Sequence, residues 1–246
     1  MTRRFSDYDP FAWFYTNYWG DEFHSEVVPL LDRFLMPLLP RKAAILDLCC
    51  GDGRLMQTLV RRGYRMTGMD SSEPMLSYAR RRLPKANLYL EDARRFKLPP
   101  DFDAVISTFD SLNHIMETAD LGKVFGNVFH CLKPGGYFLF DLNREEAYVD
   151  LWSRTSTVVD RRTVAVARGS YDSSRKIAIY DVTLMRLEKG LWQRSDFRLT
   201  QRLHLREDVF AALSDAGFDT RIYDAAADLG MRGDVGSGRD FYLARK

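Results

Sequence analysis

The chain has 246 residues, 46% of them hydrophobic, and this length suits a single α/β domain with a large buried core. Its formal net charge of +2 says little about partners. The N-terminus lacks the apolar core of a signal peptide, and the apolar segment 34–39 is too short to span a membrane. The three cysteines, Cys49, Cys50 and Cys131, show no Cys-x-x-Cys spacing, so we expect reduced thiols in the cytoplasm and no metal site.

The first segment of the chain is rich in aromatic residues, with nine of them between Phe5 and Phe23. Such rings either pack on the body of the protein or offer their faces to a cationic ligand. Both interpretations stay open at this stage.

A strand, a turn and a helix follow in residues 45–60. The apolar run 45–48 contains Asp47, breaks into the turn 49–53 with two glycines, and resumes with apolar residues on one helical face. Asp70 then closes a second short apolar segment, 64–69. Two strand ends therefore each carry a carboxylate beside a turn that lets backbone approach a ligand, an arrangement that suits a nucleoside.

The same turn argues against a phosphate-rich cofactor. A dinucleotide fingerprint needs a third glycine where this chain has Met56, and no Gly-Lys-Ser/Thr follows. A nicotinamide oxidoreductase is further disfavoured because Tyr242 and Lys246, the pair with Tyr-x-x-x-Lys spacing, lie at the extreme C-terminus. A nucleoside with a small polar tail remains, and S-adenosylmethionine fits that description.

Residues 44–143 resemble the core of the class I S-adenosylmethionine-dependent methyltransferases. The matching motifs, in chain order, are Cys50-Gly51-Asp52-Gly53, Gly68-Met69-Asp70-Ser71, Glu91-Asp92-Ala93, Phe102-Asp103-Ala104-Val105-Ile106-Ser107 and Leu132-Lys133-Pro134-Gly135-Gly136. One departure is Cys49, which stands where the family has its first glycine. The resemblance implies a Rossmann-like α/β fold: a doubly wound, seven-stranded, mostly parallel sheet with an antiparallel β insertion after the fifth strand.

The resemblance also implies a cofactor site. Asp70 is expected to accept hydrogen bonds from both ribose hydroxyls. Asp92 is expected to accept one from the adenine amino group, and the Ala93 amide is expected to donate to an adenine ring nitrogen. The alternative for both acids is that they cap turns. Asp47 is expected to order the turn or to reach the methionine amino group. The other residues expected to bind S-adenosylmethionine are Tyr15, Tyr18, Cys49, Gly51, Gly53, Ser71, Met75, Ser107 and Thr108.

Residues 120–246 are predicted to form β strands that cover the site and the remaining helices and strands of the central sheet. Apolar spacing indicates a helix between Asp120 and Leu132, and alternation over 151–205 indicates β strands, with hairpin turns expected at Gly169-Ser170 and Lys189-Gly190. A helix over 206–216, closed by Gly217, precedes strands at 218–223 and 240–244. We expect one domain, 1–246, made of lid helices (1–40), a cofactor-binding core (41–143), a roof over the substrate (144–205), and a final helix with two strands (206–246).

Methyl transfer is an in-line displacement, so the protein mainly aligns the two reactants and excludes water. A hydroxyl or ammonium acceptor must also lose a proton, and His114, just beyond the fourth strand, is the candidate base, although a loop histidine can equally be structural. Arg198, Arg202 and His204 on the predicted roof either meet the substrate or form a solvated polar face.

The predicted activity is methyl transfer from S-adenosylmethionine to nitrogen or oxygen of a small-molecule acceptor, with S-adenosylhomocysteine as product. Alternatives are a non-catalytic S-adenosylmethionine-binding module, an aminopropyl transferase and a nucleic-acid methyltransferase. Nucleic acid is not expected, because residues 109–114 lack the proline-rich motif of base-amine methylation, and the clusters 61–62 and 80–82 suit helix ends. The oligomeric state is left open.

Overall fold

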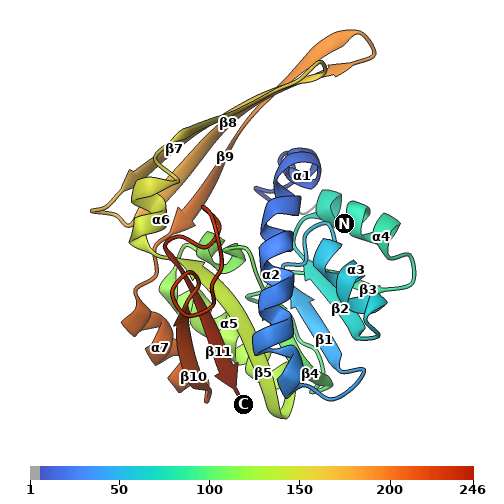
Figure 1. The fold of residues 1–246 in the computed structure, drawn as a ribbon, viewed down its shortest axis with the longest axis vertical. Coiled ribbons are helices and arrows are strands. Elements are labelled where there is room, and N and C mark those ends of the chain that lie inside the picture. Colours follow the sequence, from blue (N-terminus) through green and yellow to red (C-terminus); the bar gives the residue numbers. More distant parts are fainter. Residues whose placement is uncertain (1–5) are drawn as a thin grey trace.

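The computed structural model describes residues 6–246, and its centre is a seven-stranded sheet (Figure 1). The strands are β1 (Ala44–Leu48), β2 (Arg65–Asp70), β3 (Asn87–Leu90), β4 (Phe102–Ser107), β5 (Leu132–Asn143), β10 (Asp219–Asp224) and β11 (Arg239–Arg245). Their order is β10-β11-β5-β4-β1-β2-β3, and only β11 runs against its neighbours. The predicted seven-stranded, mostly parallel sheet is confirmed.

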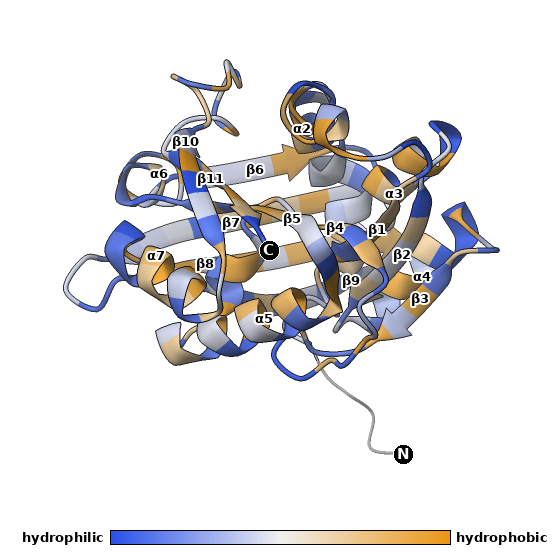
Figure 2. Ribbon diagram, turned by 90° about the horizontal axis from the view of Figure 1, so that it is seen from below, coloured by the Kyte–Doolittle hydropathy of each residue, from blue (hydrophilic) through white to orange (hydrophobic). Residues whose placement is uncertain are grey.

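Helices cover both faces of this sheet. One face carries α2 (Gly20–Phe34), α3 (Arg54–Arg61) and α4 (Glu73–Arg82), and the other carries α5 (Thr118–Cys131) and α7 (Arg206–Asp215). Seen from below, α5 and α7 lie on one side of the sheet and α2 and α3 on the other (Figure 2). Successive strand residues alternate between the faces, so Ile45 packs with α2 and α3 while Leu46 packs with α5. Both faces are therefore buried, which explains the unbroken apolar runs of the central strands.

Local signals set the ends of several helices. The Ser72 hydroxyl accepts a hydrogen bond from the Met75 amide (3.4 Å) at the start of α4. Arginines occupy the last turns of α3 and α4, where they complement the helix dipole. Gly217 follows α7 with a φ of 98°, as predicted for a left-handed helix end.

The N-terminal segment forms a lid in contact with the roof. It comprises α1 (Ala12–Phe14), the π-helical turn η1 (Tyr15–Trp19) and α2. Phe11 and Phe14 are buried against apolar residues of the roof, among them Leu184 and Leu199. Phe5, the first of the nine aromatic residues in this segment, lies outside the residues that the structure describes.

After β5, the helix α6 (Glu145–Asp150) leads into a separate antiparallel sheet that projects beyond the carboxyl ends of the central strands (Figure 1). Its strands, in spatial order, are β6 (Thr155–Val159), β7 (Thr163–Asp172), β8 (Ile177–Glu188) and β9 (Leu191–Arg202). Lys189 and Gly190 form the β8–β9 turn with φ values of 51° and 83°, so this predicted hairpin is confirmed.

The second predicted hairpin turn is wrong, because Gly169-Ser170 lies inside β7. The segment after α6 crosses β7 at this point: a Cβ on Gly169 would stand 1.5 Å from the Trp152 carbonyl oxygen, and the Gly169 amide donates to the Arg154 carbonyl (3.0 Å). Glycine is needed here for close approach of two backbones rather than for a turn.

Short 3-10 turns, η2 (Met36–Leu38) and η3 (Ser111–His114), follow α2 and β4. Within residues 6–246, no helix has the length and apolar character required to cross a membrane.

Candidate functional site

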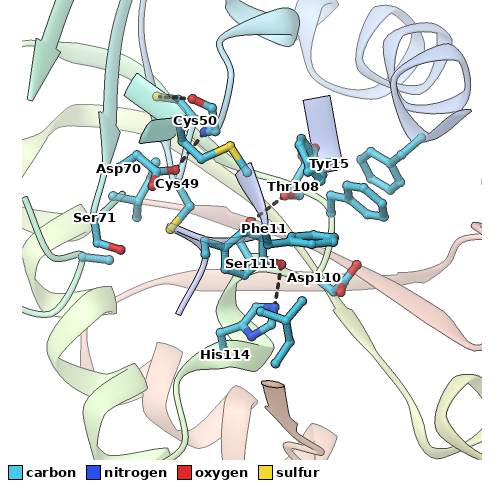
Figure 3. A pocket seen from close by; sticks show the side chains of 18 of the residues that line it. Phe11, Tyr15, Cys49, Cys50, Asp70, Ser71, Thr108, Asp110, Ser111 and His114 are labelled. Atoms are coloured by element: carbon cyan, nitrogen blue, oxygen red, sulfur yellow. Dashed lines mark hydrogen bonds between the residues drawn. The ribbon is translucent and has the colours of Figure 1, made fainter. Parts of the chain in front are cut away.

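A cavity of about 630 Å³ opens at the carboxyl edge of the central sheet. The turns after β1, β2, β3 and β4 line one half, and the lid, α6, β8 and β9 enclose the other half. Figure 3 shows Asp70, Cys49 and His114 around this space, each from a different connection. Residues separated by more than 60 positions in the sequence therefore meet at one site, at the place where parallel α/β sheets bind ligands.

The β1–α3 turn curls tightly at the floor of the cavity. Cys49, Gly51 and Gly53 all have positive φ values of 64°, 53° and 75°. Cys49 therefore keeps the left-handed conformation of a glycine at some cost in backbone strain. Gly53 has a packing role, because a Cβ there would stand 2.9 Å from the side chain of Ala79 on α4.

Asp70 holds this turn against the end of β2. One carboxylate oxygen accepts from the Gly51 amide (2.8 Å) and the other from the Ser72 amide (2.8 Å). Burial raises the pKa of Asp70 to about 6, although these two hydrogen bonds favour the ionised form. A carboxylate has about four acceptor positions, so Asp70 can also accept two hydroxyl groups from a ligand in the cavity.

Asp92, after β3, is engaged by a partner that the sequence motif did not reveal. The guanidinium of Arg94 donates to both oxygens of Asp92 (2.9 and 2.6 Å) and also approaches Asp120 (3.6 Å). The hydrogen bonds from Arg94 lower the pKa of Asp92, so this carboxylate stays ionised in the physiological range. Asp92, Ala93 and Arg94 all line the cavity.

His114 meets the lid through Tyr8. The Nδ1 of His114 lies 2.7 Å from the Thr200 carbonyl oxygen, which can only accept, so Nδ1 carries the proton. Nε2 is then an acceptor, and it receives the Tyr8 hydroxyl (2.8 Å) and the side-chain amide of Gln201 (3.1 Å). Burial lowers the pKa of His114 and raises that of Tyr8, so both groups are neutral near pH 7.

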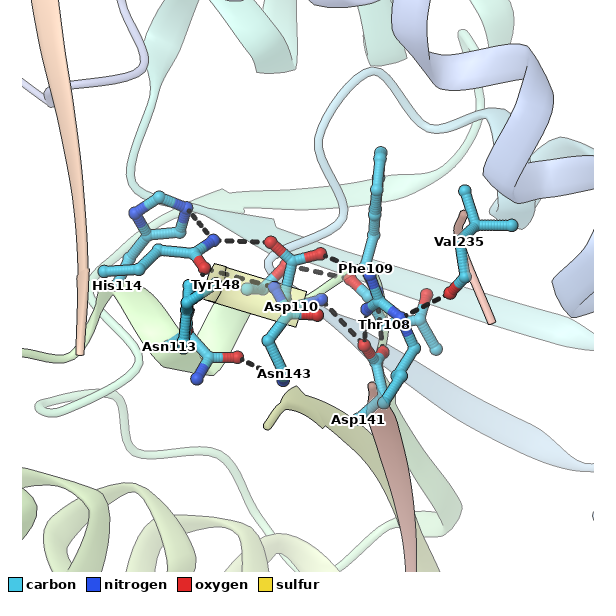
Figure 4. A network of polar contacts seen from close by, with 12 residues as sticks. Thr108, Phe109, Asp110, Asn113, His114, Asp141, Asn143, Tyr148 and Val235 are labelled. Carbon is cyan, nitrogen blue, oxygen red and sulfur yellow. Dashed lines mark hydrogen bonds and ion pairs between the residues drawn. The ribbon is translucent and has the colours of Figure 1, made fainter. Parts of the chain in front are cut away.

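A buried ionic network lies behind His114 (Figure 4). Arg239 pairs with Asp110 (3.0 Å) and with Asp141, and Gln201 donates to the other oxygen of Asp110. Asp141 also accepts the backbone amides of Phe109 (2.7 Å) and Asp110 (2.8 Å). These bonds hold Phe109 and Asp110 in left-handed conformations, with φ values of 65° and 47°. The Asp110 side chain is thereby presented at the wall of the cavity.

Comparisons with known proteins agree with this geometry. Residues 45–136 match the family model described as a methyltransferase domain. The dTDP-3-amino-3,4,6-trideoxy-alpha-D-glucopyranose N,N-dimethyltransferase of Streptomyces venezuelae is 30% identical over 201 residues, which are 80% of this chain and 84% of that protein. The chain belongs to the S-adenosylmethionine-dependent methyltransferases.

Solved structures share the whole fold. DesVI of Streptomyces venezuelae superposes with a TM-score of 0.77 at 23% identity, covering 98% of this chain and 99% of DesVI. CalS10 of Micromonospora echinaspora, solved with S-adenosylmethionine bound, gives a TM-score of 0.75 at 22% identity, covering 100% and 98%. Their coverage includes the lid and the roof as well as the core, so the predicted fold class is confirmed. The predicted cofactor, S-adenosylmethionine, is confirmed by the family membership given above.

In this methyltransferase, most of the predicted site residues come together. Those that line the cavity are Tyr15, Asp47, Cys49, Gly51, Asp70, Ser71, Met75, Asp92, Ala93, Thr108 and His114. Gly53 and Ser107 lie behind the lining: Gly53 packs on α4, and Ser107 is fully buried at the end of β4. The burial of Asp47, together with the nearby Asp70, raises its pKa.

Tyr18 was expected to bind the cofactor, but it does not reach the methyltransferase cavity. Its hydroxyl donates to Asp160 (2.6 Å) and approaches the Thr163 hydroxyl (2.9 Å) at the β6–β7 turn. The π-helical turn directs Tyr15 to the cavity and Tyr18 to the roof. Tyr18 therefore joins the lid to the roof, away from the residues that line the cavity.

The polar residues predicted on the roof also lie outside the cavity. Arg198 pairs with Asp181 (2.7 Å), the guanidinium of Arg202 donates to the Met116 carbonyl, and His204 Nε2 lies 2.9 Å from the Ile115 carbonyl. The expected solvated polar face holds for Arg198, which is exposed, but not for Arg202, which is half-buried, or for His204, which is buried.

Proposed function

We propose that this methyltransferase moves the methyl group of S-adenosylmethionine to the amino nitrogen of a small-molecule acceptor. The observation that supports it most is the continuous cavity, in which a half that fits a nucleoside continues into a half covered by the lid and the roof. A covered site suits a small molecule better than a polymer. The Streptomyces venezuelae relative and one from Streptomyces fradiae (34% identical over 117 residues) are N,N-dimethyltransferases of dTDP-linked amino sugars, which supports an amino sugar as acceptor.

The residues of the cofactor half fit S-adenosylmethionine. Asp70 would accept the ribose hydroxyls with its free acceptor positions, and Asp92 and Ala93 would hold the adenine edge. Asp47 and the backbone around Thr108 would hold the amino-acid end. When bound, S-adenosylmethionine supplies a methyl group on a positively charged sulfur, which becomes a neutral sulfide once the acceptor lone pair has bonded to the methyl carbon.

The chain supplies the route for the acceptor proton. An ammonium acceptor must lose one proton before its nitrogen can attack. The Tyr8 oxygen can take this proton while its own passes to Nε2 of His114, because Tyr8 already donates to that atom (2.8 Å). Gln201 and the Thr200 carbonyl hold the ring so that Nε2 stays the acceptor. His114 is thus the proposed base, reached through Tyr8.

The test is release of S-adenosylhomocysteine with dTDP-3-amino-3,4,6-trideoxyglucose as acceptor, compared with the analogue that carries a hydroxyl in place of the amine. We expect turnover and a mass increase of one or two methyl groups with the amine alone. His114→Ala and Tyr8→Phe should each lower kcat while leaving S-adenosylmethionine affinity close to wild type.

Normal cofactor binding without S-adenosylhomocysteine release across a panel of amino sugars, free and nucleotide-linked, would favour the alternative of a non-catalytic module. Full activity of both variants would remove the proposed proton route while leaving the transferase activity intact. As a small-molecule enzyme that draws on a soluble metabolite, the protein is proposed to act in the cytoplasm.

A further inference from the structure

The roof-side half of the cavity has aromatic walls from three separate elements. Trp19 comes from the lid, Trp152 from the segment after α6, and Tyr180 from β8, and all three line the cavity. The centroid of the Tyr180 ring lies 5.9 Å from the centroid of the Trp19 ring and 4.6 Å from that of the Trp152 ring. The interplanar angles are 88° with Trp19 and 87° with Trp152. Two indole rings therefore stand nearly perpendicular to one phenol ring, as the walls of a box do.

The position of Trp152 is fixed by the backbone around it. Its amide donates to the Ala147 carbonyl (3.1 Å), and its own carbonyl passes over Gly169 of β7, where any side chain would collide with it. This crossing explains why a glycine interrupts a roof strand that is otherwise well formed. The fold thus accommodates a strand glycine at the place that holds this indole against Tyr180.

A carboxylate with spare acceptor capacity lines the same cavity. Asp110 and Asp141 share the single guanidinium of Arg239, which leaves one negative charge in the group. Asp141 faces three donors, whereas Asp110 has Arg239 and Gln201. Asp110 lines the cavity, so its remaining acceptor positions are available to a ligand.

Tyr148 and Gln201 connect this carboxylate to the aromatic walls. The Tyr148 ring lies 5.8 Å from that of Trp152, and its hydroxyl donates to Gln201 Oε1 (3.0 Å). The amide nitrogen of the same Gln201 donates to Asp110. Aromatic faces and a carboxylate therefore border one space, and both attract a cation.

We infer that the acceptor is bound as an ammonium ion, with Trp19, Trp152 and Tyr180 around its positive charge and Asp110 as its counter-ion. This inference rests on the proposed N-methylation and deepens it by naming the charge state and the residues that recognise it. An acceptor held in this way keeps its extra proton until it is bound, which gives the pair Tyr8 and His114 a proton to remove.

The probe is tetramethylammonium, which carries the charge of an ammonium but cannot be methylated, and its neutral isostere tert-butanol. Binding of each is measured by saturation-transfer NMR on its methyl signal, with saturating S-adenosylhomocysteine to fill the cofactor half and sodium chloride to match ionic strength. We expect saturable binding of tetramethylammonium and none of tert-butanol. Equal binding of the two would overturn the inference.

Variants locate the binding. Trp152→Leu should weaken tetramethylammonium binding about 5- to 30-fold, the range for one desolvated cation–π contact, while Trp152→Phe keeps a ring and most of the affinity. Trp192→Leu is the matched control, since Trp192 is 45% exposed and lies outside the cavity lining. Equal behaviour of Trp152→Leu and Trp192→Leu would refute the aromatic walls.

Asp110→Asn should weaken binding as well, and a thermal melt checks that the variant is folded. If it does not fold, the comparison of the two Trp152 variants still decides the inference. Unchanged binding in folded Asp110→Asn would remove the carboxylate from it. Because no turnover is measured, absence of methyl transfer with amino sugars would count against the proposed function alone.

Discussion

Asp70 is expected to make cofactor affinity depend on pH. Burial raises the pKa of Asp70 to about 6 in the cofactor-free protein. Hydrogen bonds from ribose hydroxyls favour the ionised form by roughly 1.5–3 kcal/mol, the range for bonds to charged groups. This energy corresponds to a pKa decrease of about 1–2 units, so the pKa of Asp70 in the complex should be about 4–5.

The affinity should then be constant above about pH 7 and fall by roughly 10- to 150-fold as the pH decreases from about 6 to 4. Binding at about pH 5.5 should release roughly half a proton or more, because most free protein carries the proton there and most complex does not. At Asp70, the folded cofactor-free protein binds more protons than the unfolded chain between about pH 4 and 6. The contribution of Asp70 to the free energy of unfolding therefore falls as the pH rises through that window.

Isothermal titration calorimetry in two buffers of different ionisation enthalpy measures both the affinity and the released proton. Asp70→Asn should bind S-adenosylmethionine weakly and lose the proton release at pH 5.5. Asp92→Asn is the control, because Arg94 keeps the pKa of Asp92 low and outside this window. A wild-type affinity that is flat from pH 5 to 7.5 would refute the ribose assignment. The same proton release in Asp70→Asn would assign it instead to Asp47, whose pKa burial also raises.

Three substitutions test the structural arguments by urea denaturation. Gly169→Ala should lower the free energy of unfolding by about 3 kcal/mol, the upper range for overpacking. Gly122→Ala in α5 is its control: it has open space around it and should raise the free energy of unfolding by about 0.5–1 kcal/mol. Equal effects of the two substitutions would contradict the close crossing at Gly169. Arg239→Met should cost about 3–5 kcal/mol, less in acid because burial raises the pKa of Asp141, whereas Arg194→Met at an exposed ion pair should leave the unfolding transition close to wild type. Cys49→Gly should raise stability by about 1 kcal/mol, the cost of a left-handed side chain, and a decrease would show that the thiol packing outweighs the strain.

The features that the sequence predicted well have local causes. Gly51 and Gly53 mark the cofactor turn because left-handed backbone favours glycine, and Asp70 marks a strand end because it follows a short apolar run. Lys189-Gly190 indicated a hairpin for the same local reason. Such signals need only a few neighbouring residues, so they survive without knowledge of the tertiary structure.

The features that were missed depend on contacts between distant segments. Tyr8 and His114 are 106 positions apart, and Asp110 and Arg239 are 129 apart, so no local pattern joins them. Gly169 has the sequence appearance of a turn, yet its cause is a backbone segment that crosses it from α6. The sequence did contain a usable signal for one missed contact. Arg94 follows Asp92 by two residues, and this spacing lets its guanidinium donate hydrogen bonds to both oxygens of the Asp92 carboxylate.

The lid links the cofactor half of the site to the proposed proton route. Ser72 donates its amide to Asp70 (2.8 Å) and its hydroxyl to Asp9 of the lid (2.7 Å), and the adjacent Tyr8 donates to His114. The contacts that hold this segment of the lid beside Asp70 therefore also hold Tyr8 beside His114, the proposed base. Because Tyr8 and Asp9 are adjacent, one short segment makes both hydrogen bonds, so a substitution that frees Asp9 from Ser72 should also weaken the hold on Tyr8 beside His114.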